Sequence, residues 1–167
     1  MAEVVDPEMP MLTLADLGVV REVRQDGDDD TVTVTITPTY SGCPAIDAMR
    51  ADLRTRLNEA GYPRVTVHTV LSPPWSTDWI SERGLRALAE HGIAPPARTV
   101  RVGAEPGRAA ARSGPVALTL TAPPAAVRCP RCGAAATEEL SRFGPTACTA
   151  LRRCRSCREP FEHMKDI

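Results

Sequence analysis

Two pairs of cysteines constrain the last 39 residues more than any other feature of the sequence. Cys129-x-x-Cys132 and Cys154-x-x-Cys157 are separated by 21 residues. Two such pairs bring four thiolates to one ion, which is the ligand set of a closed tetrahedral site. A unit of about 40 residues cannot bury a large apolar core and usually needs a metal or a disulfide to fold. We therefore expect residues 127–167 to form a zinc-ribbon-like metal-binding domain.

The cysteine spacing leaves the metal open between zinc and iron. Zinc with four thiolates would be structural, whereas a single iron or an iron–sulfur cluster accepts the same four ligands. We expect zinc, with iron as the alternative. A fifth tail cysteine, Cys148, is a buried apolar residue, a replacement ligand, or a thiol that delivers or receives metal. His163 lies beyond the last pair, and we expect it on the surface.

The first 96 residues have a mixed α and β pattern. Residues 31–37 alternate apolar and polar side chains with β-branched residues throughout, which predicts a strand. Apolar residues at three- and four-residue steps predict a helix over 44–60. With extended segments at 19–23 and 64–71 and a second helix ending near Gly92, the order is β-β-α-β-α. We expect an α+β domain over residues 1–96, with a small three-stranded sheet and helices.

Residues 97–126 are rich in proline, glycine and alanine, which is typical of a linker. Within them Pro115–Thr121 has the composition of an edge strand. The chain is thus expected to contain two domains, 1–96 and 127–167, joined by this linker.

Cys43 stands alone between the predicted strand and the predicted helix, with Pro44 at the first helical position. Unpaired N–H groups at a helix N-terminus stabilise a thiolate, so we expect a lowered pKa for Cys43 and a role in binding metal or sulfur. The alternative is an inert residue at the cap position. Asp6, Glu8 and Asp16 can approach the same loop, but a solvated position is the default for such acids.

Composition argues against membrane and nucleic-acid partners. The formal net charge is −1, and the tail carries eight basic and five acidic residues with two phenylalanines as its aromatics. This is a weak electrostatic footprint with little stacking surface for a nucleic acid. No run approaches the roughly 18 apolar residues that a membrane span needs, and the N-terminus does not resemble a signal peptide. We expect a cytoplasmic protein.

Several segments together resemble the SufT/PaaD-like metal–sulfur cluster biosynthesis family, and within it the PaaD (PaaJ) proteins. They include both cysteine pairs and extend over nearly the whole chain, with the weakest likeness over 97–126. Besides the two cysteine pairs, the segments are Asp6–Pro10, Leu14–Val20, Thr37–Pro44, Pro74–Ile80, Gly92–Pro96, Phe143–Cys148 and Glu159–Phe161.

This resemblance implies a non-catalytic accessory protein of the phenylacetyl-CoA epoxidase system of phenylacetate catabolism. Such a protein would assist assembly of an iron–sulfur or di-iron centre, with the oxygenase or the iron–sulfur reductase subunits as partners. By position, Cys43 corresponds to the characteristic cysteine of the domain. The tail ligands would be Cys129, Cys132, Cys154 and Cys157, and Cys43 and Cys148 are the candidates for metal or cluster transfer.

Two other functions remain open at this point. One is a structural zinc-ribbon adaptor that tethers oxygenase subunits. The other is a nucleic-acid-binding zinc ribbon, which the charge and the aromatic content disfavour.

Overall fold

The computed structural model describes residues 4–26, 31–96 and 127–167. The linker expected at 97–126, with its possible edge strand, lies outside them. None of the helices in the described part is long and apolar enough to cross a membrane.

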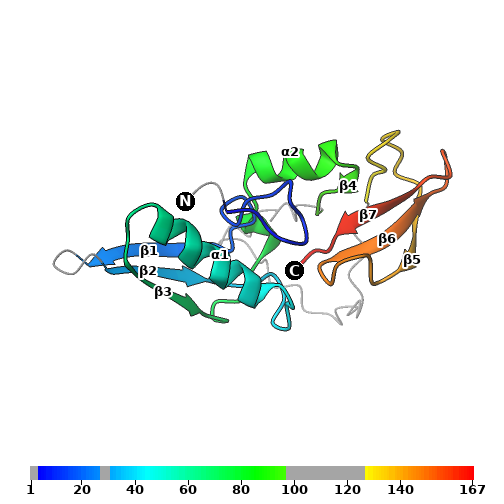
Figure 1. The fold of residues 1–167 in the computed structure, drawn as a ribbon. Helices are drawn as coiled ribbons and strands as arrows, with labels where there is room; N and C mark the ends of the chain where they lie inside the picture. The colour runs from blue at the N-terminus through cyan, green and yellow to red at the C-terminus, as the bar shows by residue number, and fades with distance from the viewer. Residues whose placement is uncertain (1–3, 27–30, 97–126) are drawn as a thin grey trace, which may run out of the picture.

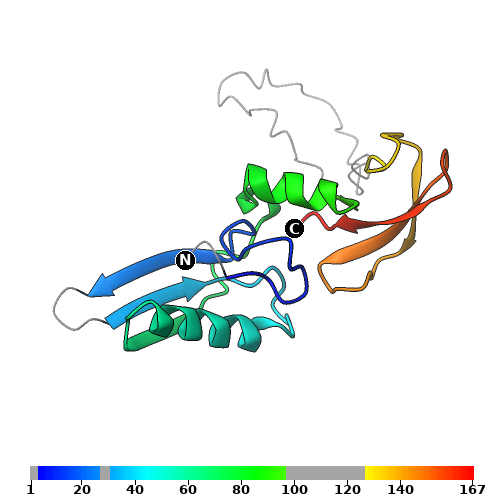
Figure 2. The ribbon, with the colours of Figure 1, turned by 45° about the horizontal axis from the view of Figure 1, so that its top comes forward.

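A three-stranded sheet forms the first unit, with strand order β1-β2-β3. Strands β1 (Val20–Asp26) and β2 (Thr31–Ile36) are antiparallel, and β3 (Arg64–Thr69) lies parallel to β2 on its other side. The parallel pair needs a crossover, which helix α1 (Ile46–Glu59) provides as it lies along the sheet (Figure 2). The predicted order of elements is confirmed.

The periodicity of the sequence accounts for how α1 and β2 pack together. Every second residue of β2 is buried, and the buried residues of α1 are Met49, Leu53 and Leu57, which follow the helical repeat. The helix begins at Ile46, two residues later than the spacing predicts, because residues 44–45 form a turn and Ala45 occupies the N-cap.

Residues 4–18 fold as a hydrogen-bonded loop whose final turn is fixed to helix α2 (Glu82–Glu90). The buried Asp16 carboxylate accepts hydrogen bonds from Thr13 Oγ1 at 2.5 Å and Ser81 Oγ at 2.8 Å, and it pairs with Arg83. Ser81 also caps α2 by accepting from the N–H of Gly84. Asp16 is therefore a structural residue, and the prediction that it is solvated is wrong. A short 3-10 helix, η1 (Thr77–Trp79), precedes α2.

The second sheet has the strand order β4-β7-β6-β5, and it draws one strand, β4, from the part of the chain before residue 97. Strands β5 (Thr137–Ser141), β6 (Thr149–Cys154) and β7 (Pro160–Met164) form an antiparallel ribbon. The two-residue strand β4 (Ile93–Ala94) follows α2 and pairs in parallel with β7. None of the sequence patterns predicted this pairing.

The ends of β6 and β7 pack against the first unit (Figure 1). Cys148, just before β6, and Met164, at the end of β7, belong to the same buried cluster as Met9, Leu12 and Met49. The N–H of Thr77 also donates to the carbonyl of Ile167 at 3.2 Å. The larger apolar core is thus shared between the two units.

Gly18 ends the turn of residues 13–18 where the chain passes Trp79. It has φ +66°, and a Cβ there would lie 2.6 Å from both the Cβ and the carbonyl oxygen of Trp79. We predict that Gly18→Ala lowers the free energy of unfolding more than Gly92→Ala, measured by urea denaturation. Gly92 shares the positive φ, at +77°, but a Cβ at that position would have no atom within 4 Å.

The backbone conformation alone should cost about 1–2 kcal/mol at either position. The clash with Trp79 should add about 1–3 kcal/mol at Gly18. Equal losses in the two variants would show that the close approach to Trp79 does not matter.

Candidate metal centre

Each cysteine pair of the tail lies in a tight turn with the same backbone geometry. The N–H of Gly133 donates to the carbonyl of Cys129 at 2.9 Å, and the N–H of Arg158 donates to that of Cys154 at 3.0 Å. The two donor residues have positive φ angles of +73° and +67°. Glycine adopts this conformation without strain, so Gly133 is the residue expected there, whereas Arg158 does so against its preference.

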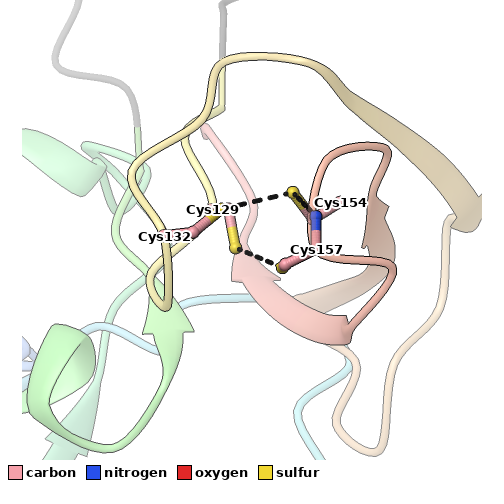
Figure 3. Close-up of side chains that lie close together, drawn as sticks. All are labelled: Cys129, Cys132, Cys154 and Cys157. Atoms are coloured by element: carbon pink, nitrogen blue, oxygen red, sulfur yellow. Dashed lines mark hydrogen bonds between the residues drawn. The ribbon is translucent and has the colours of Figure 1, made fainter.

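The two turns bring four sulfurs together, as Figure 3 shows. Cys129 Sγ lies 3.8 Å from Cys157 Sγ, Cys132 Sγ lies 3.5 Å from Cys154 Sγ, and all four sulfurs are within 4.8 Å of one another. A tetrahedron with metal–sulfur bonds of about 2.3 Å has edges of about 3.8 Å. The donor set and its spacing therefore fit a four-coordinate thiolate-bound metal, which makes the cluster a candidate metal-binding site.

In the second turn, backbone N–H groups favour ionisation of the Cys154 sulfur. The N–H of Cys157 points at the sulfur of Cys154 at 3.5 Å and, together with the N–H of Ser156, lowers the pKa of Cys154 to about 6. Cys154 and Cys129 are buried, whereas Cys132 and Cys157 are exposed. The site thus lies at the surface of the ribbon, with one cysteine of each pair buried.

His163 is not part of this cluster, and its expected surface position is wrong. It is 6% exposed on β7, and its Nε2 has no hydrogen-bond partner among the described residues. Burial, and then the charge of Arg152, lower the pKa of His163 to about 4, so the ring is neutral at physiological pH. It faces a cavity whose lining includes Arg152 and Lys165.

Cys43 lies in the loop between β2 and α1 and is 9% exposed. Its pKa is raised, which corrects the expectation of an activated thiolate. Burial is the largest cause, and the carboxylates of Glu8 and Asp6 add to it. The N–H groups of Ala45 and Ile46 lower the pKa as a helix N-terminus should, but burial and the two negative charges outweigh them.

Cys148 also lies in the shared core, at 5% exposure and outside the four-sulfur cluster. Burial raises its pKa, although a contact with the Thr146 hydroxyl at 3.1 Å lowers it. The carboxylates of Asp6 and Glu8 raise it further. The same two acids therefore act on Cys43 and on Cys148, which come from different halves of the chain.

Asp6 is 3% exposed, so its expected solvated position is wrong, while Glu8 is half-buried. Asp6 Oδ1 accepts hydrogen bonds from the N–H groups of Glu8 at 2.7 Å and Met9 at 2.8 Å. Burial raises the pKa of Asp6, and these two bonds oppose the rise. The Asp-Pro pair at 6–7 is a common start of such a side-chain-capped turn, and it is the signal by which the sequence could have placed Asp6.

The two halves of the chain match two family models. Residues 1–70 match the iron–sulfur cluster assembly protein family, and residues 113–165 match the PaaD zinc beta ribbon domain. The class of protein is therefore an iron–sulfur cluster assembly domain joined to a zinc ribbon.

Full-length similarity identifies the particular family. Over 167 residues the chain is 41% identical to a putative subunit of the 1,2-phenylacetyl-CoA epoxidase of Escherichia coli (strain K12), covering 100% of this chain and 89% of that protein. It is 36% identical over 86 residues to the Fe-S protein maturation auxiliary factor SufT of Staphylococcus aureus (strain USA300), covering 51% of this chain and 96% of that protein. A Fe-S protein maturation auxiliary factor of Porphyromonas gingivalis (strain ATCC BAA-308 / W83) is also 36% identical over 86 residues, covering 51% of this chain and 80% of that protein. The chain belongs to the PaaD family, which confirms the resemblance seen in the sequence.

The raised pKa values of Cys43 and Cys148 predict how these thiols respond to pH. Alkylation requires the thiolate, so the iodoacetamide rate at both positions should still be rising with pH where a free cysteine has levelled off. The measurement is mass spectrometry of the metal-loaded protein after timed alkylation across a pH series. Denatured protein is the control, and there both thiols should follow free cysteine. If the alkylation rate of Cys43 levels off near neutral pH, its pKa is lowered and the expectation of an activated thiolate is correct.

Proposed function

We propose that this protein is an accessory maturation protein of a phenylacetyl-CoA epoxidase system, and that it helps to assemble an iron–sulfur or di-iron centre of that machinery. The observation that carries the proposal is one buried thiol, Cys43, beside two carboxylates within the part of the chain that matches the iron–sulfur assembly family. The full-length similarity to a putative epoxidase subunit supports the choice of system.

The chemistry at Cys43 suits a cargo that is held and then released. A thiol with a raised pKa is protonated at neutral pH, so iron or a cluster must displace its proton to bind, and reprotonation favours release. Asp6 and Glu8 contribute negative charge that attracts a cation to the loop. We propose that Cys43 holds iron, sulfur or a cluster in transit, and that the oxygenase or the iron–sulfur reductase receives it.

The four tail cysteines would hold zinc as a resident structural ion. With all four positions filled by protein thiolates, zinc has no open position for a substrate, and its contribution is to close the fold of the ribbon. Cys129 and Cys132 fix the first turn to the end of β6, where Cys154 lies.

We predict that the protein purified without oxygen is colourless and contains about one zinc per chain, by metal analysis and visible absorption of one sample. Cys154→Ser should lose the zinc and the hydrogen-exchange protection of β5–β7, because the ribbon has little core of its own. Ser156→Ala, a change in the same turn, should retain both. Iron with charge-transfer bands at this site would instead make the tail the carrier.

A second function, an adaptor that tethers oxygenase subunits, is favoured by an apolar surface next to the Cys43 loop. Tyr40, Leu71 and Ile167 are exposed and line a cavity of about 240 Å³ with Pro74 and Trp75. Such a surface suits contact with another protein. An adaptor role predicts that the epoxidase subunits have normal metal content but fail to assemble when this protein is absent.

The maturation role predicts that Cys43→Ser lowers the iron content of a client. The oxygenase and reductase subunits would be co-expressed with the wild-type protein, with Cys43→Ser, with Ser41→Ala or with none, then purified and assayed for iron and acid-labile sulfide. Cys43→Ser should reduce iron in one client to the level found without this protein, because serine is a far poorer ligand for iron. Ser41→Ala, in the same loop, should leave it unchanged.

The sulfide assay separates the two clients, since only an iron–sulfur centre contains acid-labile sulfide. Full iron loading of every client with Cys43→Ser would remove Cys43 from the mechanism. Circular dichroism of the purified variant controls for misfolding.

A further inference from the structure

One cavity in the ribbon has a charged lining that the proposed function does not use. Its volume is about 310 Å³, which suits a small organic ligand or a single side chain of a partner protein. Three cationic side chains, two acidic ones and a histidine line it: Arg142, Arg152, Lys165, Glu139, Asp166 and His163.

The register of the ribbon places the central part of this lining on one face of the sheet. Arg152 of β6 pairs with Glu139 of β5, and His163 of β7 pairs with Ala150 of β6. Paired residues share a face, and so do Ala150 and Arg152, which are two residues apart on one strand. Arg152 and His163 are therefore diagonal neighbours on adjacent strands, which lie side by side in Figure 1.

Two nitrogens of these neighbours are buried and have no hydrogen-bond partner in the described part of the chain. They are Nε2 of His163, which is 6% exposed, and Nε of Arg152. The terminal nitrogens of Arg152 already interact, with Glu139 Oε2 at 3.5 Å and with Thr137 Oγ1 at 3.5 Å. An unpartnered buried polar group is costly, and an ordered water or an ion often accounts for one. Because both side chains line the same cavity, one ligand group held there would account for both nitrogens.

The charge of the lining favours an anion over a water molecule. Three cationic and two acidic side chains give it a net charge of +1, and His163, with a pKa of about 4, is neutral at physiological pH. Glu139 is already paired with Arg152, whereas the exposed Arg142 forms no ion pair with a described residue. Water would satisfy the two nitrogens and leave the excess positive charge, which a monoanion would balance.

Lys165 has hydrogen-bonding capacity left for such a ligand. Its Nζ donates to the carbonyl of Ala147 at 2.7 Å and lies 4.6 Å from the centre of the Phe143 ring. An ammonium group has three donors, and the bond to the carbonyl occupies one of them.

We propose that this cavity is a binding site for a carboxylate, held by Arg142, Lys165 and the two unpartnered nitrogens of Arg152 and His163. A carboxylate is a monoanion whose two oxygens accept several hydrogen bonds, and arginine is its usual partner. A neutral histidine ring has one N–H, so the bound carboxylate would select the tautomer of His163 with its proton on Nε2. The inference goes beyond the maturation role and does not depend on it.

Sodium acetate, titrated into the full-length protein as purified, tests the proposal. The readout is the nitrogen NMR signals of the His163 ring and of Arg152 Nε, with sodium chloride at the same ionic strength as the reference. Acetate should shift both signals together and to saturation. The ring signals of the acetate complex should mark Nε2 as the protonated nitrogen.

Arg152→Gln should weaken acetate binding at least about tenfold, because it removes a hydrogen bond between two charged groups. Arg153→Gln is the matched control and should retain the wild-type affinity. Arg153 is the next residue of β6, on the opposite face, and it pairs with Glu138. The two variants remove the same charge, so a difference between them reports the site rather than the net charge. His163→Phe, which keeps a ring and removes the donor, should also weaken binding.

Circular dichroism and metal content establish that each variant is folded. If His163→Phe is not, the ring signals of the wild-type protein still report on this residue. Acetate shifts that match those of chloride would overturn the proposal, and so would saturable binding that leaves the His163 signals in place. Equal acetate affinity of Arg152→Gln and the wild-type protein would also overturn it. Tighter binding of phosphate than of acetate would overturn the choice of a monoanion.

The carboxylate can belong to a small organic acid or to an acidic side chain of a partner protein, and calorimetry with the purified oxygenase and reductase subunits separates the two sources. If the partner supplies it, Arg152→Gln should weaken binding of a subunit, and acetate should compete with that subunit. If a small acid is the ligand, Arg152→Gln should lose acetate binding and bind the subunits as the wild-type protein does. Either result supports the site.

Discussion

The meeting of four thiolates at the two tail turns is the constraint on which the second half of the protein depends. The ribbon has a small buried cluster of its own, with Cys129 and Cys154 among its five members beside Ala94, Val127 and Phe161. A unit with so small a core of its own usually needs a metal to fold, and four sulfurs that meet at one point would supply the ligands. The second turn connects β6 to β7, and the opposite ends of these two strands pack against the first unit.

The two units are joined by a strand pairing and by a shared apolar core. Strand β4 pairs with β7, and Met164 and Cys148 complete the apolar core beneath the N-terminal loop. The SufT relative aligns over 96% of its length with 51% of this chain, so it has no counterpart of the other half. The ribbon therefore adds to the part of the chain that aligns with this relative a buried thiol, Cys148, in the same apolar core as Cys43.

Electrostatics around Cys43 show why local sequence rules are insufficient there. A cysteine before a helix is the usual setting for a stabilised thiolate, and the N–H groups of Ala45 and Ile46 act in that direction. Desolvation and the charges of Asp6 and Glu8 raise the pKa of Cys43 by more than these N–H groups lower it. Both effects are large because the thiol is buried, where the dielectric constant is low. The result is a thiol that stays protonated at neutral pH.

Local sequence patterns were enough to predict the main elements and the meeting of the four tail cysteines. Alternation in β2, the helical repeat of Met49, Leu53 and Leu57, and the paired cysteines have a physical meaning that does not depend on distant residues. The burial of Asp6, Asp16 and His163, the pairing of β4 with β7, and the apolar core that Cys148 shares with the first unit emerge only in the folded chain. These features depend on contacts between segments far apart in the chain, and burial changes the charge state and the neighbours of a side chain without leaving a pattern in its own sequence.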